Sequence, residues 1–129
     1  MVGVVTVSHG FLCRELINSV SMIGGSLKQA GYVDLEPGEN PEMFEKRIRI
    51  EIAKEDTGDG ALVLVDMLGG TPFNRVGILA NELNIAVITG MNMPMLMSVL
   101  MERREDTTLQ KMANMAKEAA IKGIRLLKK

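Results

Sequence analysis

Aromatic side chains are scarce in this chain: its 129 residues include no Trp, one Tyr and three Phe. The chain also contains neither a GxGxxG turn nor the lysine pattern of a phosphate-binding P-loop. Nucleotide and flavin sites usually combine such a loop with an aromatic ring that stacks on the ligand. The composition therefore argues against a nucleotide or flavin site.

Cysteine and long apolar runs are scarce as well. The single cysteine, Cys13, cannot form an internal disulfide, and we expect it to be a small buried thiol. No charged segment followed by an apolar core and a cleavage site opens the chain. The apolar runs fall well short of the ~20 residues that span a bilayer. We expect a reduced, cytoplasmic protein that acts at a membrane only through a partner.

An excess of one charge is also missing. The chain has 15 Lys and Arg against 16 Asp and Glu, and these are interspersed, so no basic stripe favours nucleic acid as a partner. The charged run at residues 102–106 is typical of a solvated helix end. A single histidine, His9, without a second soft ligand makes a metal site a poor interpretation. The length fits one domain over residues 1–129.

What the sequence does contain is a regular alternation of strand-like and helix-like segments. Residues 2–7, 61–65 and 85–88 are apolar runs rich in β-branched side chains, a pattern typical of strands buried on both faces. Residues 32–35 are shorter and more polar, which predicts an edge strand. A last possible strand covers residues 124–127, where apolar and polar side chains alternate after a glycine.

Five segments between and after these runs have apolar residues at helical spacing. Their start and stop signals are Gly24-Gly25, Asn40-Pro41, Thr71-Pro72, Pro94 and Asp106-Thr107-Thr108. Pro94 opens a short helix rich in methionine over residues 95–101.

This order of elements predicts an α/β fold: a doubly wound, mostly parallel sheet with strand order 2-1-3-4 and helices on both faces. In that order the first and third strands are neighbours, and the loops that follow them leave toward opposite faces. His9 follows the first strand and Asp66 follows the third. We therefore expect the only imidazole to meet a strand-end carboxylate.

The pairing of His9 with Asp66 has a chemical consequence. An Asp that accepts a hydrogen bond from one ring N–H fixes the tautomer and leaves the lone pair of the other nitrogen aimed outward. The same carboxylate stabilises the cationic ring that forms when that nitrogen is phosphorylated. We interpret His9 as the nucleophile and Asp66 as the residue that orients it. The alternatives are a turn-capping histidine and an aspartate that only ends a strand.

A glycine-rich turn, Gly69-Gly70-Thr71-Pro72, follows Asp66. Two glycines let backbone N–H groups approach an anion closely, Thr71 adds a hydroxyl at the expected helix cap, and Pro72 presets the first helical φ. The turn thus predicts a phosphate cradle at the positive end of a helix. The alternative is a strand-to-helix loop that needs these residues only for its geometry.

Four motifs in register resemble the IIA domain of the mannose class of the bacterial phosphoenolpyruvate-dependent sugar phosphotransferase system. They follow the four strands and cover nearly the whole chain. They are Val7-Ser8-His9-Gly10, Pro37-Gly38-Glu39-Asn40, Leu64-Val65-Asp66 with Gly69-Gly70-Thr71-Pro72-Phe73-Asn74, and Gly90-Met91-Asn92-Met93-Pro94-Met95-Leu96.

The resemblance implies that a histidine at the position of His9 takes a phosphoryl group from phosphohistidine on the carrier HPr. It then passes the group to a IIB domain, which serves the IIC and IID permease components in the membrane. The resemblance also implies that Asp66 holds the ring and that Gly70 and Thr71 receive the phosphate. No cofactor is expected. Many members continue into a IIB domain, which we expect here to be a separate polypeptide.

Related IIA domains are homodimers in which a terminal antiparallel strand crosses to the other subunit, and residues 124–127 match that strand in the order of elements. Phe11, Leu68, Met91 and Met93 are expected at the surface that faces the protein partners. Leu68 stands where the family often has an aromatic residue, and methionine adapts to varied surfaces. The remaining methionines of the cluster, Met95, Met97 and Met101, are expected in the core.

Three other functions fit parts of the pattern. A receiver-type phosphoaspartate switch also has an Asp after its third strand, but it needs a pair of acids where this chain has Ser8-His9-Gly10. A phosphoryl-donor domain for dihydroxyacetone kinase shares the fold and the histidine but lacks the Gly-Gly-Thr-Pro-Phe-Asn pattern. The third function is a non-enzymatic, flavodoxin-like binding module. The leading interpretation is a phosphotransferase with a phosphohistidine intermediate.

Overall fold

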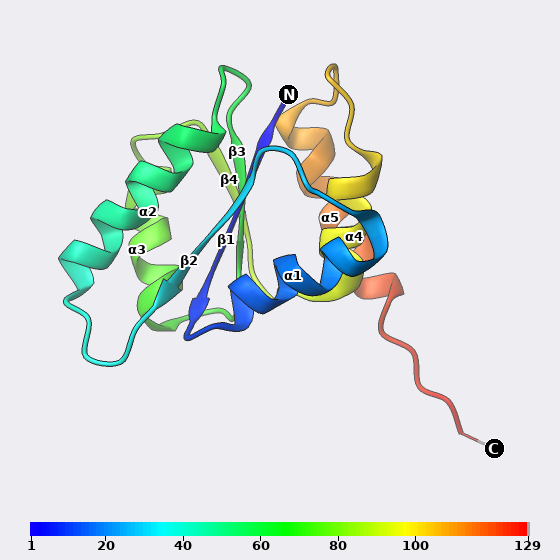
Figure 1. Cartoon of the computed structure of the whole chain (residues 1–129), viewed down its shortest axis with the longest axis horizontal. Coiled ribbons are helices and arrows are strands. Elements are labelled where there is room, and N and C mark those ends of the chain that lie inside the picture. The colour runs from blue at the N-terminus through cyan, green and yellow to red at the C-terminus, as the bar shows by residue number, and fades with distance from the viewer. Residues whose placement is uncertain (129) are drawn as a thin grey trace.

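Four parallel strands form the centre of the protein, which we describe from a computed structural model over residues 1–128 (Figure 1). The strands are β1 (Gly3–His9), β2 (Ala30–Leu35), β3 (Ala61–Val65) and β4 (Ile85–Ile88). The helices are α1 (Leu12–Gly24), α2 (Pro41–Glu55), α3 (Gly70–Ala80), α4 (Met93–Glu102) and α5 (Leu109–Lys122).

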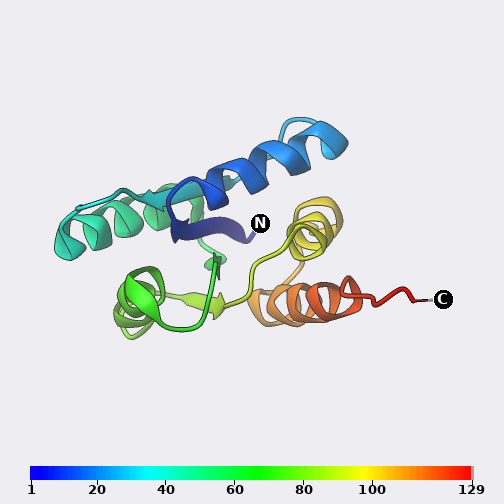
Figure 2. The same cartoon turned by 90° about the horizontal axis from the view of Figure 1, so that it is seen from below.

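The strand order is β2-β1-β3-β4, and every neighbouring pair is parallel. Helices α2 and α3 cover one face of the sheet, and α1, α4 and α5 cover the other (Figures 1 and 2). The predicted doubly wound α/β fold with order 2-1-3-4 is confirmed. Because β1 and β3 are neighbours, the segments that follow them emerge side by side at the carboxyl edge of the sheet.

The core consists of two apolar clusters, one on each face of the sheet. Successive side chains of a strand point to opposite faces, so β1 sends Val4 to one cluster and Val5 to the other. Strand β3 does the same with Leu62 and Val63, and all five of its residues are buried. Strand β4 is only half-buried because it lies at the edge of the sheet, so the expectation of burial on both faces is wrong for this strand.

Side-chain caps fix the start of three helices. Asn40 accepts hydrogen bonds from the N–H groups of Glu42 and Met43 before α2, as its position before Pro41 predicted. Asn92 and Thr108 cap α4 and α5 in the same way. Over residues 1–128, no helix is long and apolar enough to cross a membrane.

The C-terminal segment differs from the sequence prediction. Residues 124–128 form no strand within the chain, and Figure 1 shows them leading away from the helices and the sheet. Ile124 is 74% exposed, and Leu126 and Leu127 are each 91% exposed. A strand exists only where its backbone N–H and C=O groups meet a neighbouring strand, and this tail meets none in its own chain. The predicted antiparallel strand is therefore absent from the described subunit.

Candidate functional site

The only histidine lies at the end of β1, with half of its side chain exposed. Its Nδ1 lies 2.7 Å from Oδ2 of Asp66, and its backbone N–H donates to the same oxygen at 2.9 Å. A carboxylate only accepts hydrogen bonds, so Nδ1 carries a proton, and in the neutral ring Nε2 then keeps a free lone pair. The topology thus brings together the two residues that the sequence placed after neighbouring strands.

Asp66 is itself held in place. Its side chain is only 9% exposed, and Oδ1 accepts a hydrogen bond from the N–H of Met67 at 2.8 Å. Its own N–H donates to the carbonyl oxygen of Val7, which continues the β1–β3 ladder by one residue. Both carboxylate oxygens are therefore occupied, and the one that faces His9 has a fixed direction.

Ser8 shapes the turn that presents His9, a role that the sequence did not reveal. Its buried hydroxyl donates to the carbonyl oxygen of Gly10 and accepts from the N–H of Cys13 at 2.8 Å. Gly10 has φ +56°, a conformation that favours glycine, and its N–H donates to the carbonyl oxygen of Leu35. Cys13 is fully buried, as expected, and burial raises the pKa of its thiol.

The glycine-rich turn lies against the imidazole. A Cβ placed on Gly70 would lie 3.1 Å from Cε1 and 3.4 Å from Nε2 of His9, so only glycine leaves this side of the ring open. Gly70 is also the first residue of α3 and has φ +83°. The first N–H groups of a helix have no partner inside the helix and can bind an anion. An anion on Nε2 therefore lies next to the N-terminus of α3.

Thr71 does not act as a cap, which corrects the expectation from sequence. The helix begins at Gly70, Gly69 stands at the cap position, and no side chain caps α3. Thr71 instead contributes to the wall of an open groove of about 300 Å³ beside His9. The opposite wall is formed by the end of β2 and the loop that follows it, with Leu35, Glu36, Pro37, Gly38, Glu39 and Pro41.

Comparison with known proteins identifies the family. The family model described as the PTS system fructose IIA component, EIIA-man, matches residues 3–117. The chain belongs to the EIIA-man family. The resemblance to mannose-class IIA domains is thereby confirmed, and membership supports a phosphotransfer role in a sugar phosphotransferase system.

Individual EIIA-man relatives agree with this assignment. The mannose-specific EIIAB component of Escherichia coli K12 is 34% identical over 128 residues, which are 98% of this chain and 40% of that protein. The fructose-specific EIIA component of Bacillus subtilis 168 is 28% identical over 115 residues, which are 88% of this chain and 78% of that protein. The chain thus spans less than half of the length of the Escherichia coli relative.

Solved structures show the same fold. The phosphotransferase system component EIIA from Streptococcus agalactiae superimposes with a TM-score of 0.89 at 25% identity, and the match covers 98% of this chain and 97% of that one. The mannose/sorbose-specific IIA subunit from Enterococcus faecalis gives a TM-score of 0.87 at 21% identity, over 98% and 95% of the two chains.

Of the residues expected at the partner-facing surface of this EIIA-man protein, two are prominently exposed. Phe11 is 61% exposed and Leu68 is 72% exposed. Met91 is only 7% exposed, so its assignment to the surface is wrong. Its N–H donates to the carbonyl oxygen of Val65, and this extension of the sheet turns the side chain into the core. Met93 is half-buried and packs against the same cluster.

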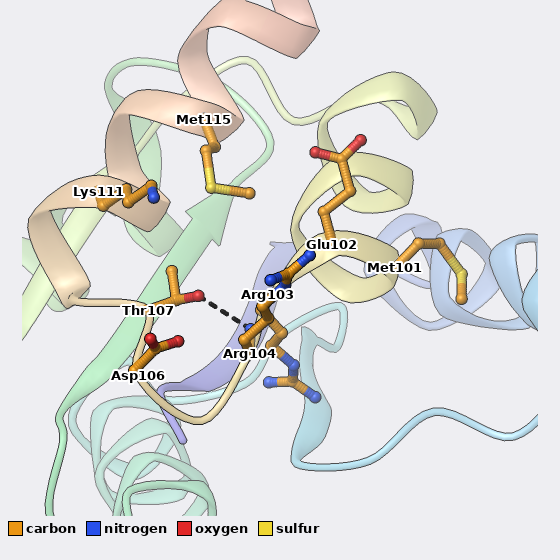
Figure 3. A pocket seen from close by; sticks show the side chains of 8 residues that line it. All are labelled: Met101, Glu102, Arg103, Arg104, Asp106, Thr107, Lys111 and Met115. Atoms are coloured by element: carbon orange, nitrogen blue, oxygen red, sulfur yellow. Dashed lines mark hydrogen bonds between the residues drawn. The ribbon is translucent and has the colours of Figure 1, made fainter.

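The other methionines also divide differently from the expectation. Met95 is buried and Met97 packs against the core, as predicted, but Met101 is 45% exposed. Met101 lies at the last turn of α4, beyond the apolar cluster, and lines a larger cavity of about 840 Å³. Figure 3 shows this cavity with the charged side chains of Arg103, Arg104 and Lys111 around it.

This larger cavity lies near the amino ends of the strands, whereas His9 lies at their carboxyl ends. Arg103 donates hydrogen bonds there to the carbonyl oxygens of Val2 and Gln29, which directly precede β1 and β2. The prediction of a solvated helix end at residues 102–106 is therefore wrong for Arg103, which is half-buried. Within residues 1–128, no group of three or more His, Cys, Asp or Glu side chains is placed to hold a metal ion.

Proposed function

We propose that this protein is the cytoplasmic IIA component of a sugar phosphotransferase system, in which His9 accepts a phosphoryl group from phosphohistidine on HPr and passes it to a IIB partner. One observation carries the proposal: Nδ1 of the only histidine is bound to Asp66 at 2.7 Å, which leaves Nε2 free beside Gly70. IIB would in turn serve the IIC and IID components of a permease.

The transfer step follows from that geometry. The lone pair of Nε2 attacks the phosphorus atom, the bond from phosphorus to the donor imidazole breaks, and its electron pair remains with the donor ring. The proton on Nδ1 stays in its hydrogen bond to Asp66, whose negative charge stabilises the phosphorylated, cationic ring. Transfer onward reverses these steps, with the IIB nucleophile attacking and neutral His9 leaving.

The phosphoryl oxygens have partners within reach of Nε2. Gly70 leaves room beside the ring, and the N-terminus of α3 supplies backbone N–H groups and the positive end of a helix dipole. Thr71, in the wall of the same groove, adds a hydroxyl. These groups support Gly70 and Thr71 as the phosphate-binding residues.

The surroundings of His9 favour protein partners over a small sugar. Four apolar side chains of the segments that follow β1 and β3 are each at least half exposed: Phe11, Leu12, Met67 and Leu68. Exposed apolar side chains grouped around a polar centre are typical of surfaces that contact other proteins. A docked partner covers them and excludes water from the transferring phosphoryl group.

The test uses the mass of the purified protein after incubation with phosphoenolpyruvate, Enzyme I and HPr. We expect one added phosphoryl group that is lost in acid and stable in alkali, as a phosphoramidate is. His9→Ala should remove this label and unfold at an unchanged temperature, because an exposed ring at a strand end bears little packing load. Normal labelling of His9→Ala, or a label lost in alkali, would contradict the proposal.

A further inference from the structure

Asp34 is a buried carboxylate of β2. It stands opposite Ser8 in the β1–β2 ladder, one position before the pairing of His9 with Leu35. The residue is only 2% exposed, and two arginines reach it. Nη2 of Arg14 lies 2.7 Å from Oδ2, and Nη2 of Arg47 lies 3.5 Å from Oδ1. Because a buried charge is costly unless it is paired, Asp34 fixes both guanidinium groups against β2.

Arg14 packs against the loop that follows His9. Its guanidinium carbon lies 4.8 Å from the centre of the Phe11 ring and 5.1 Å from the centre of the Tyr32 ring. Within residues 1–128, the Nε of Arg14 has no hydrogen-bond partner, so the two rings rather than a forked salt bridge set the plane of the group. Arg14 thereby holds Phe11, two residues after His9, in one orientation although that ring is mostly exposed.

Arg47 binds the turn after β2, which lines the groove beside His9. Its Nη1 donates to both carboxylate oxygens of Glu39 at 2.9 Å and to the backbone carbonyl oxygen of Asp34 at 3.1 Å. Glu39 also accepts from the N–H of Glu36, so the whole turn after β2 is tied to Arg47. Both Glu36 and Glu39 line the groove that His9 enters. Asp34 is thus connected to Phe11, in the loop after β1, through Arg14, and to the groove-lining turn after β2 through Arg47.

The exposure of Phe11 separates a docking role from a purely structural one. A ring that is held still while more than half exposed loses conformational freedom and gains little burial in the free protein. The gain comes on association, because a side chain that is already ordered has less entropy to lose when a partner covers it.

We propose that Asp34, through Arg14 and Arg47, is a positioning residue that presets Phe11 in the loop after β1 and the turn after β2, on the surface around His9, for the protein that delivers the phosphoryl group. This role rests on the proposed function, since it concerns the docking surface of the same site. The occupant is the folded surface of a phosphocarrier protein, with an apolar patch that covers Phe11.

The experiment measures phosphoryl transfer from phosphorylated HPr as a function of HPr concentration. For Arg14→Gln we expect KM to rise about 5- to 30-fold, the equivalent of two exposed cation–π contacts, while kcat changes less than twofold. Arg14→Lys keeps a cation near Asp34 but loses the planar group, so KM should also rise. Arg49→Gln is the matched control, because Arg49 is a half-exposed arginine of α2 that pairs with Glu82 and does not line the groove beside His9. The KM of this variant should not change.

A double-mutant cycle shows whether Arg14 acts through Phe11. If it does, Phe11→Leu and Arg14→Gln each raise KM, and the double variant is no worse than the poorer single variant. Two outcomes would overturn the positioning role: KM values for Arg14→Gln and Arg14→Lys within twofold of the wild-type value, or additive effects in the cycle. In either case, labelling of His9 would still support the proposed function. If the wild-type protein takes no label at all, the positioning role and the proposed function are both overturned. Arg14→Lys keeps the test valid if Arg14→Gln unfolds.

Discussion

Asp66 illustrates how one carboxylate can serve both fold and chemistry. Oδ2 accepts from the backbone and the ring of His9, and Oδ1 accepts from the N–H of Met67. The backbone contacts fix the carboxylate before any phosphoryl group arrives, so the ring meets a partner that needs no rearrangement. Such fixed partners lower the barrier because little reorganisation is left for the reaction itself.

Asp66→Asn is expected to slow transfer without abolishing it. The amide can offer an oxygen to His9 only by turning its NH₂ group toward the N–H of Met67, where two donors meet, and it carries no charge to stabilise the phosphorylated ring. Loss of an orienting carboxylate costs about 10⁴-fold in triad hydrolases, and we expect a smaller loss here because binding also contributes. Single-turnover labelling from phosphorylated HPr measures it. Unchanged rates toward both partners would make Asp66 structural only.

Gly70→Ala tests the space beside the ring, and Gly69→Ala is its matched control. Both glycines have φ +83°, and Gly69, with ψ 173°, is in a region that almost only glycine adopts, so each alanine costs about 1–3 kcal/mol of stability from backbone strain. Only at Gly70 does the new Cβ approach His9, whereas nothing lies within 4 Å at Gly69. We expect both variants to lose unfolding temperature but only Gly70→Ala to be labelled much more slowly. Equal labelling rates would show that Gly70 serves the turn alone.

Residue positions at the site were predictable to the extent that topology alone decides them. His9 and Asp66 each end a strand, and the strand order brings strand ends together. Met91 was misplaced because one extra ladder bond beyond β4, to Val65, turns its side chain inward. Arg14 was missed because its contacts with Asp34 and Tyr32 join segments about 20 residues apart, and no local pattern encodes them.

At the scale of the element, α2 ends with an acidic pair that faces the start of β2. Glu55 is buried, and burial raises the pKa of its carboxyl above the ordinary 4.5, with further contributions from the hydrogen bond and the charge of Glu51. A Cβ at Gly31 would overlap the Glu51 carboxylate, so any larger residue in this strand would displace the Glu51 side chain. Lys54 and Arg103 oppose the shift but do not cancel it.

The raised pKa of Glu55 makes the stability of the fold depend on pH. A carboxyl whose pKa is higher in the folded than in the unfolded protein adds stability below about pH 4.5, and this stability is lost as the pH rises through the folded value. Glu55→Gln, which stays neutral, should therefore raise the unfolding temperature at pH 7 and give no gain near pH 4. Glu118→Gln, at an exposed position of α5, is the control. A gain that is the same at both pH values would contradict a protonation effect.

The boundaries of the elements show where local patterns suffice. Strands β3 and β4 begin and end where their apolar runs do, and Asn40-Pro41 marks the start of α2. Strand β2 begins two residues earlier than its apolar pattern predicts, at Ala30-Gly31, because these residues pair with Val4 and Val5 of β1. Pairing with a neighbour overrides a weak strand preference, and a single segment of sequence does not contain that information.

At the scale of the whole molecule, the strand order leaves β4 at one edge of the sheet, and that edge is incomplete. All four of its residues are only half-buried, and a groove of about 420 Å³ runs beside it, with Val87, Ile88 and Ile121 in its lining. The tail of the chain carries apolar side chains at Leu126 and Leu127 that are almost fully exposed. An open strand edge and an unpaired apolar tail in one chain are complementary features.

We propose that these features meet between two copies of the chain, so that residues 124–127 of each subunit form the antiparallel strand that covers the β4 edge of the other. Exchange of an identical segment is a low-cost route to a two-fold dimer. Full-length protein should then scatter light as a dimer. Truncation after Lys122 should yield a monomer with lower solubility and a lower unfolding temperature, since it removes the cover of the edge.

Two further variants test whether the dimer depends on the apolar side chains of the tail or only on its length. Leu126→Ser with Leu127→Ser keeps the length of the tail but removes the apolar contacts, and it should weaken the dimer. Lys128→Ser, at an exposed polar position of the same tail, should leave the dimer intact. A full-length chain that stays monomeric at high concentration, or a truncated chain that remains a well-behaved dimer, would refute strand exchange. Neither result would affect the chemistry proposed for His9, because the site lies at the carboxyl ends of β1 and β3, whereas the exchange concerns the open side of β4.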